Sequence, residues 1–210
     1  MKPVKLFSIL VLILPIFALQ LNAKFLEKNA IYLTGGLNVG NFWGGNLNLN
    51  YVFEEKYSLQ AGISGLLRES KSKPEDFSSG VVGIFTLGLS NLLYLDEMEN
   101  YHLLAGKIFM LNRNNTSRLN LAGGIGYTIL TEPTNWKRVT GYTIGENYTY
   151  DRITHGTISL IINPGIEFPF TRYLGFTLSP MLQISKYRTY VGFGIEMMIG
   201  LLRKPITHRI

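Results

Sequence analysis

The chain has 210 residues, no cysteine and a formal net charge of +6. This length suits a single domain, and the lack of thiols excludes a disulfide framework, a Cys-based metal site and a Cys nucleophile. Charged residues make up only 16% of the chain, below the roughly 25% usual in soluble domains, and no basic run is dense enough to predict nucleic-acid binding.

The N-terminus has the layout of a secretory signal peptide. Two lysines give a positive start, an apolar run extends from Leu6 to Leu19, and Ala23 provides a small residue for cleavage. The apolar run is too short for a comfortable membrane-spanning helix. We therefore predict a signal peptide over 1–23 and one exported domain over 24–210, with an N-terminal anchor helix as the alternative.

The rest of the chain alternates between apolar and polar side chains, which places every second side chain on one face of a strand. In 190–201, for example, Val191, Phe193 and Ile195 share a face opposite Tyr190 and Glu196. The alternation predicts eight strands, over 30–40, 46–53, 57–68, 101–111, 117–130, 157–168, 174–185 and 190–201.

One further segment, 80–93, also resembles a strand. Transmembrane barrels of bacteria have an even number of strands, so we interpret it as part of a structured outer loop or as an extension of the fourth strand. A barrel of ten strands is the alternative, although 94–100 is too short for another span of about 9–11 residues.

The composition of the two faces predicts which one is inside. The polar faces are rich in Gly, Ser, Thr and Asn, which suit a narrow lumen, and the apolar faces are nearly free of charge, as contact with lipid demands. Strands in lipid must also close into a barrel, because every backbone polar group needs a partner. We therefore predict an all-β fold, a closed antiparallel up-and-down transmembrane β-barrel. A soluble β-sandwich is the alternative.

The connections and the aromatic residues fit the barrel. The short links 54–56, 112–116 and 169–172 would be periplasmic turns, and the long links 69–99 and 132–152 would lie outside. Tyr and Phe side chains near strand ends would form the aromatic girdles at the membrane boundary. Two prolines inside predicted strands, Pro164 and Pro180, each remove a ladder donor, and we expect local bulges there.

Several segments carry a resemblance to the small outer-membrane barrels of the OmpX/OmpA type, the porin-like outer-membrane β-barrel domains. They are YLTGGLNVG (32–40), LNLAGGIGYTIL (119–130) and TYVGFGIEMMIGLL (189–202), and the resemblance covers about 30–202. It implies location in the cell outer membrane and insertion by the barrel-assembly machinery. Because such barrels differ in function, it implies no activity. We expect a monomer that contacts outer-membrane lipid and lipopolysaccharide.

Four ionisable side chains on the predicted polar faces form the sharpest candidate site. Glu196 lies in the middle of the last strand, and Glu167, Arg118 and Lys107 lie near periplasmic strand ends. Buried charges need partners, so we predict a lumen network in which the two glutamates pair with Arg118 and Lys107. Such a network would be structural and would fill the lumen. The alternative is that each group faces water at a barrel end.

The sequence gives little support for an enzyme, a cofactor or a metal site. His102 and His155 are predicted near outer strand ends. Ser159 follows His155 on the same face, but the two lie roughly 13 Å apart along an extended strand and cannot form a direct pair. A lipid-modifying enzyme and a narrow pore remain the alternatives to a structural or interaction role.

The second long link is the candidate interaction surface. It combines aromatic and cationic side chains, which suit adhesion or contact with lipid headgroups. The alternative is an outer rim without a specific ligand. The candidate residues are Trp136, Lys137, Arg138, Tyr142, Tyr148 and Tyr150.

Overall fold

The computed structural model describes residues 29–78, 94–112, 117–140 and 146–202. The predicted signal peptide, the segment 80–93 and Tyr142 lie outside these residues. No helix in the described part of the chain is long and apolar enough to cross a membrane.

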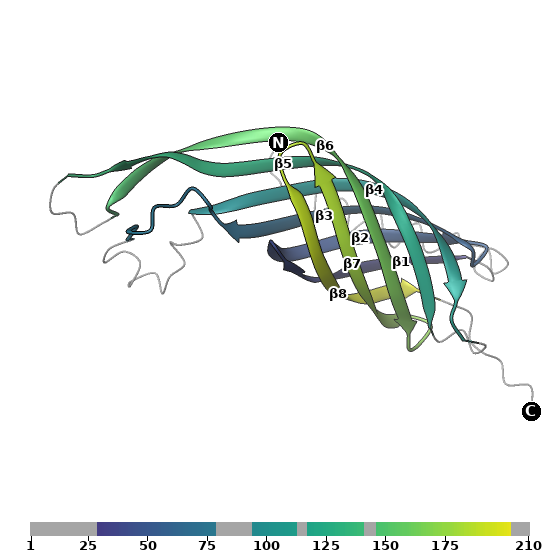
Figure 1. The fold of residues 1–210 in the computed structure, drawn as a ribbon. Coiled ribbons are helices and arrows are strands. Elements are labelled where there is room, and N and C mark those ends of the chain that lie inside the picture. Colours follow the sequence, from purple (N-terminus) through teal and green to yellow (C-terminus); the bar gives the residue numbers. More distant parts are fainter. Residues whose placement is uncertain (1–28, 79–93, 113–116, 141–145, 203–210) are drawn as a thin grey trace, which may run out of the picture.

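Eight strands form a single closed barrel in chain order (Figure 1). Each strand pairs antiparallel with the next, and β1 pairs with β8. This topology confirms the predicted up-and-down barrel and its strand number. The strands are β1 (Ala30–Gly40), β2 (Trp43–Phe53), β3 (Tyr57–Glu69), β4 (Leu95–Met110), β5 (Arg118–Arg138), β6 (Tyr148–Pro169), β7 (Leu174–Ser185) and β8 (Thr189–Leu201).

The two ends of the barrel differ. The terminal end is where β1 begins and β8 ends, and it carries the short turn at 54–56 and the turn after β6. At the opposite end β5 and β6 project well past the other strands (Figure 1), and we call this the extension end. The two strands have 21 and 22 residues, about twice the 9–11 needed to span a bilayer.

The projecting strands correct one prediction, because most of the link 132–152 is a β-hairpin rather than a loop. We call Thr134–Arg138 and Tyr148–Asp151 the hairpin extension. Its register shifts by one residue between Thr134 and Lys137, where Asn135 has a φ of 53°. Such a bulge turns the following side chains, and it directs Trp136 toward the tyrosines of β6.

The alternation of the sequence is reproduced as alternation between lumen and outer wall. In β8, Tyr190 is fully buried, whereas Val191 is 57% exposed. The predicted faces are found in β1, β2, β3 and β5 to β8.

The prediction for the fourth strand was wrong, because its faces are inverted. Leu104 and Ile108 are buried in the lumen, and Lys107 is exposed on the outer wall. The sequence here is apolar on both faces, so the pattern alone did not decide between them. The neighbouring strand decides: Leu59 of β3, which points outward, lies directly opposite Ala105, and directly opposed residues share a face.

The two strand prolines also differ from expectation. Pro164 and Pro180 occupy opposing positions of β6 and β7, because 162 pairs with 182 and 166 pairs with 178 in the same register. Neither proline can donate a backbone hydrogen bond, so the pairing of β6 with β7 is interrupted between residues 162 and 166 of β6. The two prolines share one interruption of the ladder without a bulge.

Two apolar clusters and many buried polar side chains fill the lumen. An apolar cluster near the extension end contains Phe42, Leu66, Met98 and Tyr190 among others. A second apolar cluster near the terminal end contains Tyr32, Val52, Met198 and Leu202 among others. Buried polar side chains fill the rest of the lumen, and they include the predicted carboxylates Glu167 and Glu196.

Candidate functional site

Two of the predicted lumen charges form a buried ion pair. Arg118 and Glu167 lie directly opposite each other on β5 and β6, and Arg118 Nε donates to Glu167 Oε2. Glu167 Oε1 accepts from the Tyr32 hydroxyl at 3.0 Å and from Asn120 Nδ2 at 3.2 Å, and Arg118 Nη1 donates to the Leu202 carbonyl at 3.2 Å. The pair therefore ties together β1, β5, β6 and Leu202, the residue that follows β8.

The other two predicted members do not join this pair. Glu196 is buried and accepts hydrogen bonds only from neutral donors in the described structure: Asn46 at 2.8 Å, Asn48 at 3.3 Å and Ser179 at 2.8 Å. Lys107 lies outside the lumen, because β4 is inverted. The predicted four-residue network is thus wrong as a unit, and Glu196 loses the cation that was assigned to it.

A chain of neutral hydrogen bonds runs through the lumen toward Glu196. Gln183 Nε2 donates to Thr128 Oγ1 at 2.8 Å, and Thr128 Oγ1 donates to Asn100 Oδ1 at 3.1 Å. Asn100 Nδ2 then lies 3.0 Å from His102 Nδ1, and His102 Nε2 lies 3.0 Å from Asn48 Oδ1. This orientation makes Nδ1 an acceptor and Nε2 a donor, which is the neutral tautomer.

The sequence pattern did not identify these polar residues as a site. The signal was their inward position in the alternation, but which of them meet across the lumen depends on the barrel. His102 itself was predicted near an outer strand end, and the structure places it in the lumen, 4% exposed. Ser159 is also deep in the lumen, where its Oγ lies 2.9 Å from Thr128 Oγ1.

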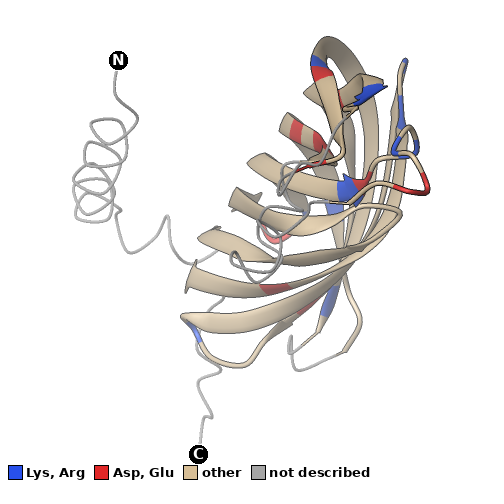
Figure 2. Ribbon diagram, turned by 90° about the vertical axis from the view of Figure 1, so that its left-hand side faces the viewer, with Lys and Arg blue, Asp and Glu red and all other residues tan. Residues whose placement is uncertain are grey.

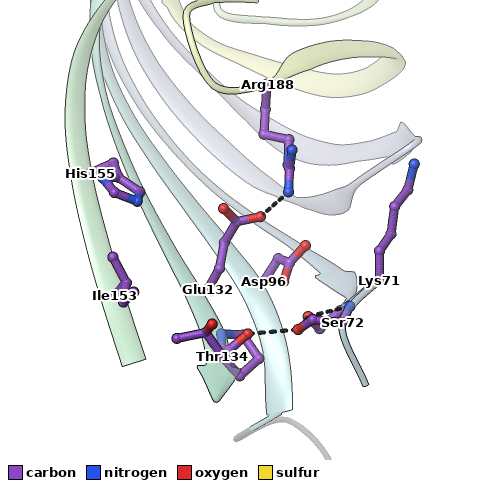
Figure 3. Close-up of a pocket in the computed structure, with 10 residues that line it drawn as sticks. Lys71, Ser72, Asp96, Glu132, Thr134, Ile153, His155 and Arg188 are labelled. Carbon is purple, nitrogen blue, oxygen red and sulfur yellow. Dashed lines mark hydrogen bonds and ion pairs between the residues drawn. The ribbon is translucent and has the colours of Figure 1, made fainter. Parts of the chain in front are cut away.

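A pocket of about 200 Å³ lies at the extension end of the lumen (Figure 3). Glu132 and Arg188 form an ion pair across it, and the nearly fully buried Asp96 pairs with Arg68. The first pair ties β5 to the link before β8, and the second ties β3 to β4, so charged side chains gather at the mouth of the barrel.

His155 also lines this pocket, and its ring stacks on Tyr187 with centroids 4.6 Å apart. Its position at the mouth separates it from the buried Ser159, as the strand spacing predicted. Within the described ranges, no group of three or more His, Cys, Asp or Glu side chains is arranged to hold a metal ion.

An aromatic cluster lies beyond the mouth, on the hairpin extension. Trp136 is 5.0 Å from Tyr150 and 5.4 Å from Phe77 between ring centroids, and Tyr94 is 4.5 Å from Phe77. Tyr148 completes the cluster. Three of the predicted interaction residues, Trp136, Tyr148 and Tyr150, therefore pack against one another and are half-buried.

The described part of the β3–β4 link is attached to this cluster by polar contacts. The Tyr148 hydroxyl donates to Asp76 Oδ1 at 2.7 Å, and this hydrogen bond raises the pKa of Tyr148 above its ordinary value. Arg138 lies 3.3 Å from Asp76, and Trp136 Nε1 donates to Ser72 Oγ at 3.1 Å. The predicted cations Lys137 and Arg138 remain exposed at the edge of the cluster.

The outer wall between the two ends is apolar. Figure 2 shows charged residues gathered mainly around the extension, while long stretches of the strands carry none. The wall residues Leu103, Ile125, Ile158 and Ile195 are 60–73% exposed. Exposed aromatic side chains flank the wall, with Phe53, Tyr57, Phe170 and Tyr173 at the terminal end and Trp43, Tyr101 and Tyr127 toward the extension end.

A closed barrel with an apolar wall and a polar lumen defines the class of eight-stranded transmembrane β-barrels. No family model and no curated protein matches the chain. Among solved structures it is similar to Ail, the attachment invasion locus protein of Yersinia pestis, with a TM-score of 0.46 and 12% identity over 83% of this chain and 96% of that one. It is also similar to Neisserial surface protein A, with a TM-score of 0.43 and 6% identity over the same shares.

Proposed function

We propose that this chain is an integral protein of the bacterial outer membrane, exported with removal of 1–23, in which a closed barrel holds the hairpin extension above the membrane as an interaction surface. The observation that carries the proposal is the inverted polarity of the barrel. Large apolar side chains cover the wall, and the buried polar ones face the lumen. Water would have to solvate that wall in a soluble protein, at a cost that grows with its apolar area.

The position of Lys107 is compatible with a membrane. It lies opposite Tyr57, in the girdle at the terminal end, where a long cationic side chain can extend toward the interface. Its ammonium group lies 5.3 Å from the Phe109 ring. A charge at this height on the wall costs much less than one at the middle of the bilayer.

The filled lumen favours a closed barrel over the narrow pore. We expect refolded protein in planar bilayers to give no resolved unitary conductance, because two apolar clusters and buried polar side chains occupy the lumen and eight strands leave room only for side chains. A large porin in the same bilayers serves as the positive control. Stable, voltage-proportional current steps would instead support the pore.

The enzyme alternative has less support. In the described structure the two strand histidines are occupied by other contacts: His102 by the amides of Asn48 and Asn100, and His155 by the Tyr187 ring. Among the described residues, neither histidine forms a hydrogen bond with a hydroxyl group that it could activate. Nucleophilic catalysis requires such a hydrogen bond.

The hairpin extension supports the interaction role. Its rings form a small core of their own, which fixes the strands, and Lys137 and Arg138 are left at the exposed edge. Lys73 adds a third cation, 5.5 Å from the Phe77 ring. We propose that these cations contact the phosphate groups of surrounding lipopolysaccharide.

Replacing Lys137 and Arg138 together by glutamate should weaken binding to immobilised lipopolysaccharide about tenfold or more, since each cation near an anionic surface contributes about 1 kcal/mol. Surface plasmon resonance on detergent-solubilised protein measures the effect, and binding by the unmodified protein should weaken as salt is added. Trp136 fluorescence reports whether the aromatic cluster stays intact.

The matched control changes the same net charge at the other end of the barrel. Lys56→Glu with Arg172→Glu alters the two terminal-end turns and should leave binding unchanged. Equal binding by both double variants would rule out a role for the extension cations.

A further inference from the structure

Glu196 is a buried carboxylate without a countercharge. It is 3% exposed, and no cationic side chain among the described residues contacts it. Asn46 Nδ2 donates to its Oε1 and Asn48 Nδ2 donates to its Oε2. Because both oxygens accept from amide groups, the contacts fit the ionised carboxylate, which has acceptors only.

Glu196 also accepts a hydrogen bond from Ser179 Oγ, so neutral donors surround its carboxylate but no countercharge balances it. On the inward face of β8 it lies between Met198 of one apolar cluster and Tyr190 of the other, and the outer wall of β8 is apolar. An isolated carboxylate in such a medium is costly unless it is paired or neutralised. The neighbouring pair of Arg118 and Glu167 has no net charge. The ionised Glu196 therefore gives this part of the lumen one net negative charge.

A small cavity lies beside this carboxylate. It has a volume of about 20 Å³, which is room for one water-sized occupant. Carboxylates, carboxamides, hydroxyls and one glycine line it, and no basic residue does so. Its lining residues include Glu196, Glu167, Asn163, Ser179, Thr34 and Asn50.

An independent observation points to a ligand in this cavity. Asn163 lines it and is 94% buried, since only 6% of its surface is exposed, yet its Oδ1 has no hydrogen-bond partner. A buried carbonyl oxygen without a partner costs about 1–3 kcal/mol. The occupant must therefore offer positive charge or a hydrogen to Asn163 as well as to Glu196.

The strand register places the two carboxylates on either side of the same position. Glu167 lies opposite Thr177 on β7, and Thr177 lies opposite Glu196 on β8. Two steps across antiparallel strands separate the Cα atoms by roughly 10 Å, so both side chains can reach an occupant between them. Arg118 adjoins Glu167 on its other side, from β5.

We propose that this cavity binds a monovalent cation, with sodium as the best fit. Carboxylate, carboxamide and hydroxyl groups line the cavity, and hard cations take the oxygen atoms of such groups as ligands. One positive charge balances the single excess negative charge. A divalent ion is disfavoured for two reasons. It would leave an excess positive charge in this part of the lumen, and calcium takes 6–8 oxygen ligands, too many for a cavity that holds one water-sized occupant.

The test is cation-dependent stability of the refolded full-length barrel in detergent. Thermal unfolding is followed by circular dichroism in sodium chloride and in N-methyl-D-glucamine chloride at equal ionic strength, since the larger cation cannot enter the cavity. We expect sodium to raise Tm by about 3–5 °C at tenfold its Kd. Titration calorimetry of sodium into protein equilibrated with the large cation should show saturable heat.

Two variants locate the effect. Glu196→Gln keeps the shape of the side chain and removes the charge, and Asn163→Ala removes a single oxygen and leaves Glu196 in place. Both should lose most of the sodium-dependent shift in Tm, and the second covers the case in which the first fails to fold. Glu99→Gln, an exposed carboxylate on the outer wall, is the matched control and should keep the full shift.

Two results would overturn the proposal. Equal Tm values for the unmodified protein in the two cations would mean that Glu196 is neutralised by a proton and that the cavity contains only water. A sodium effect that survives in both cavity variants would place the ion elsewhere.

Discussion

Replacing Arg118 by methionine is expected to lower the free energy of unfolding by about 3–5 kcal/mol, the usual cost of removing one partner of a buried ion pair. The change leaves the Glu167 carboxylate in the lumen with only the Tyr32 hydroxyl and the Asn120 amide as donors. It also removes the hydrogen bond to the Leu202 carbonyl. Denaturant unfolding of the refolded barrel in detergent micelles measures the loss.

The controls separate a buried charge from lost packing. Arg118→Met combined with Glu167→Leu should recover most of the stability, because removing both charges leaves no unpaired ion. Lys107→Met removes a cation from the outer wall and should change stability by less than about 1 kcal/mol. A loss as large for Lys107→Met as for Arg118→Met would contradict the placement of these two residues.

An arginine at Ile195 is expected to destabilise the barrel in lipid by about 2–4 kcal/mol, the cost of a guanidinium at mid-bilayer on the lipid face. Ile195 is 60% exposed and lies between Leu178 and Leu37 on the neighbouring strands, near the middle of the wall. Reversible unfolding from phospholipid vesicles, compared with the unmodified chain, measures the difference.

The corresponding change on the hairpin extension tests whether lipid is responsible. Thr149 is exposed and lies beyond the barrel wall, so Thr149→Arg should be nearly neutral. If Ile195→Arg were equally neutral, and the unmodified protein stayed monodisperse in buffer without detergent, the apolar wall would not face lipid and the membrane assignment would fall.

The strand pattern was predictable because it is local. A period of two follows from the geometry of an extended chain, whatever the strand pairs with. β8 shows this well, since glycines and Glu196 alternate with large apolar residues. β4 was the exception because Leu103, Leu104 and Ala105 are consecutive, so both faces look apolar and only pairing with β3 selects one.

The candidate sites were less predictable because they depend on residues that are distant in the sequence. The sequence placed Glu167 and Arg118 on the polar face, but their pairing requires the β5–β6 register. The aromatic residues of the hairpin extension were identified, whereas their packing on Phe77 and Tyr94 was not, because those two come from the link between β3 and β4.

The amino-acid sequence by itself determined that strands form and which side of most strands is apolar, since alternation is a property of neighbouring residues. Only the tertiary structure decided which charges meet in the lumen. The β3–β4 register leaves Lys107 outside, and closing the sheet brings β1 against β8 and leaves Glu196 without a cation. Pairing energy depends on distances across the lumen, which no local pattern encodes.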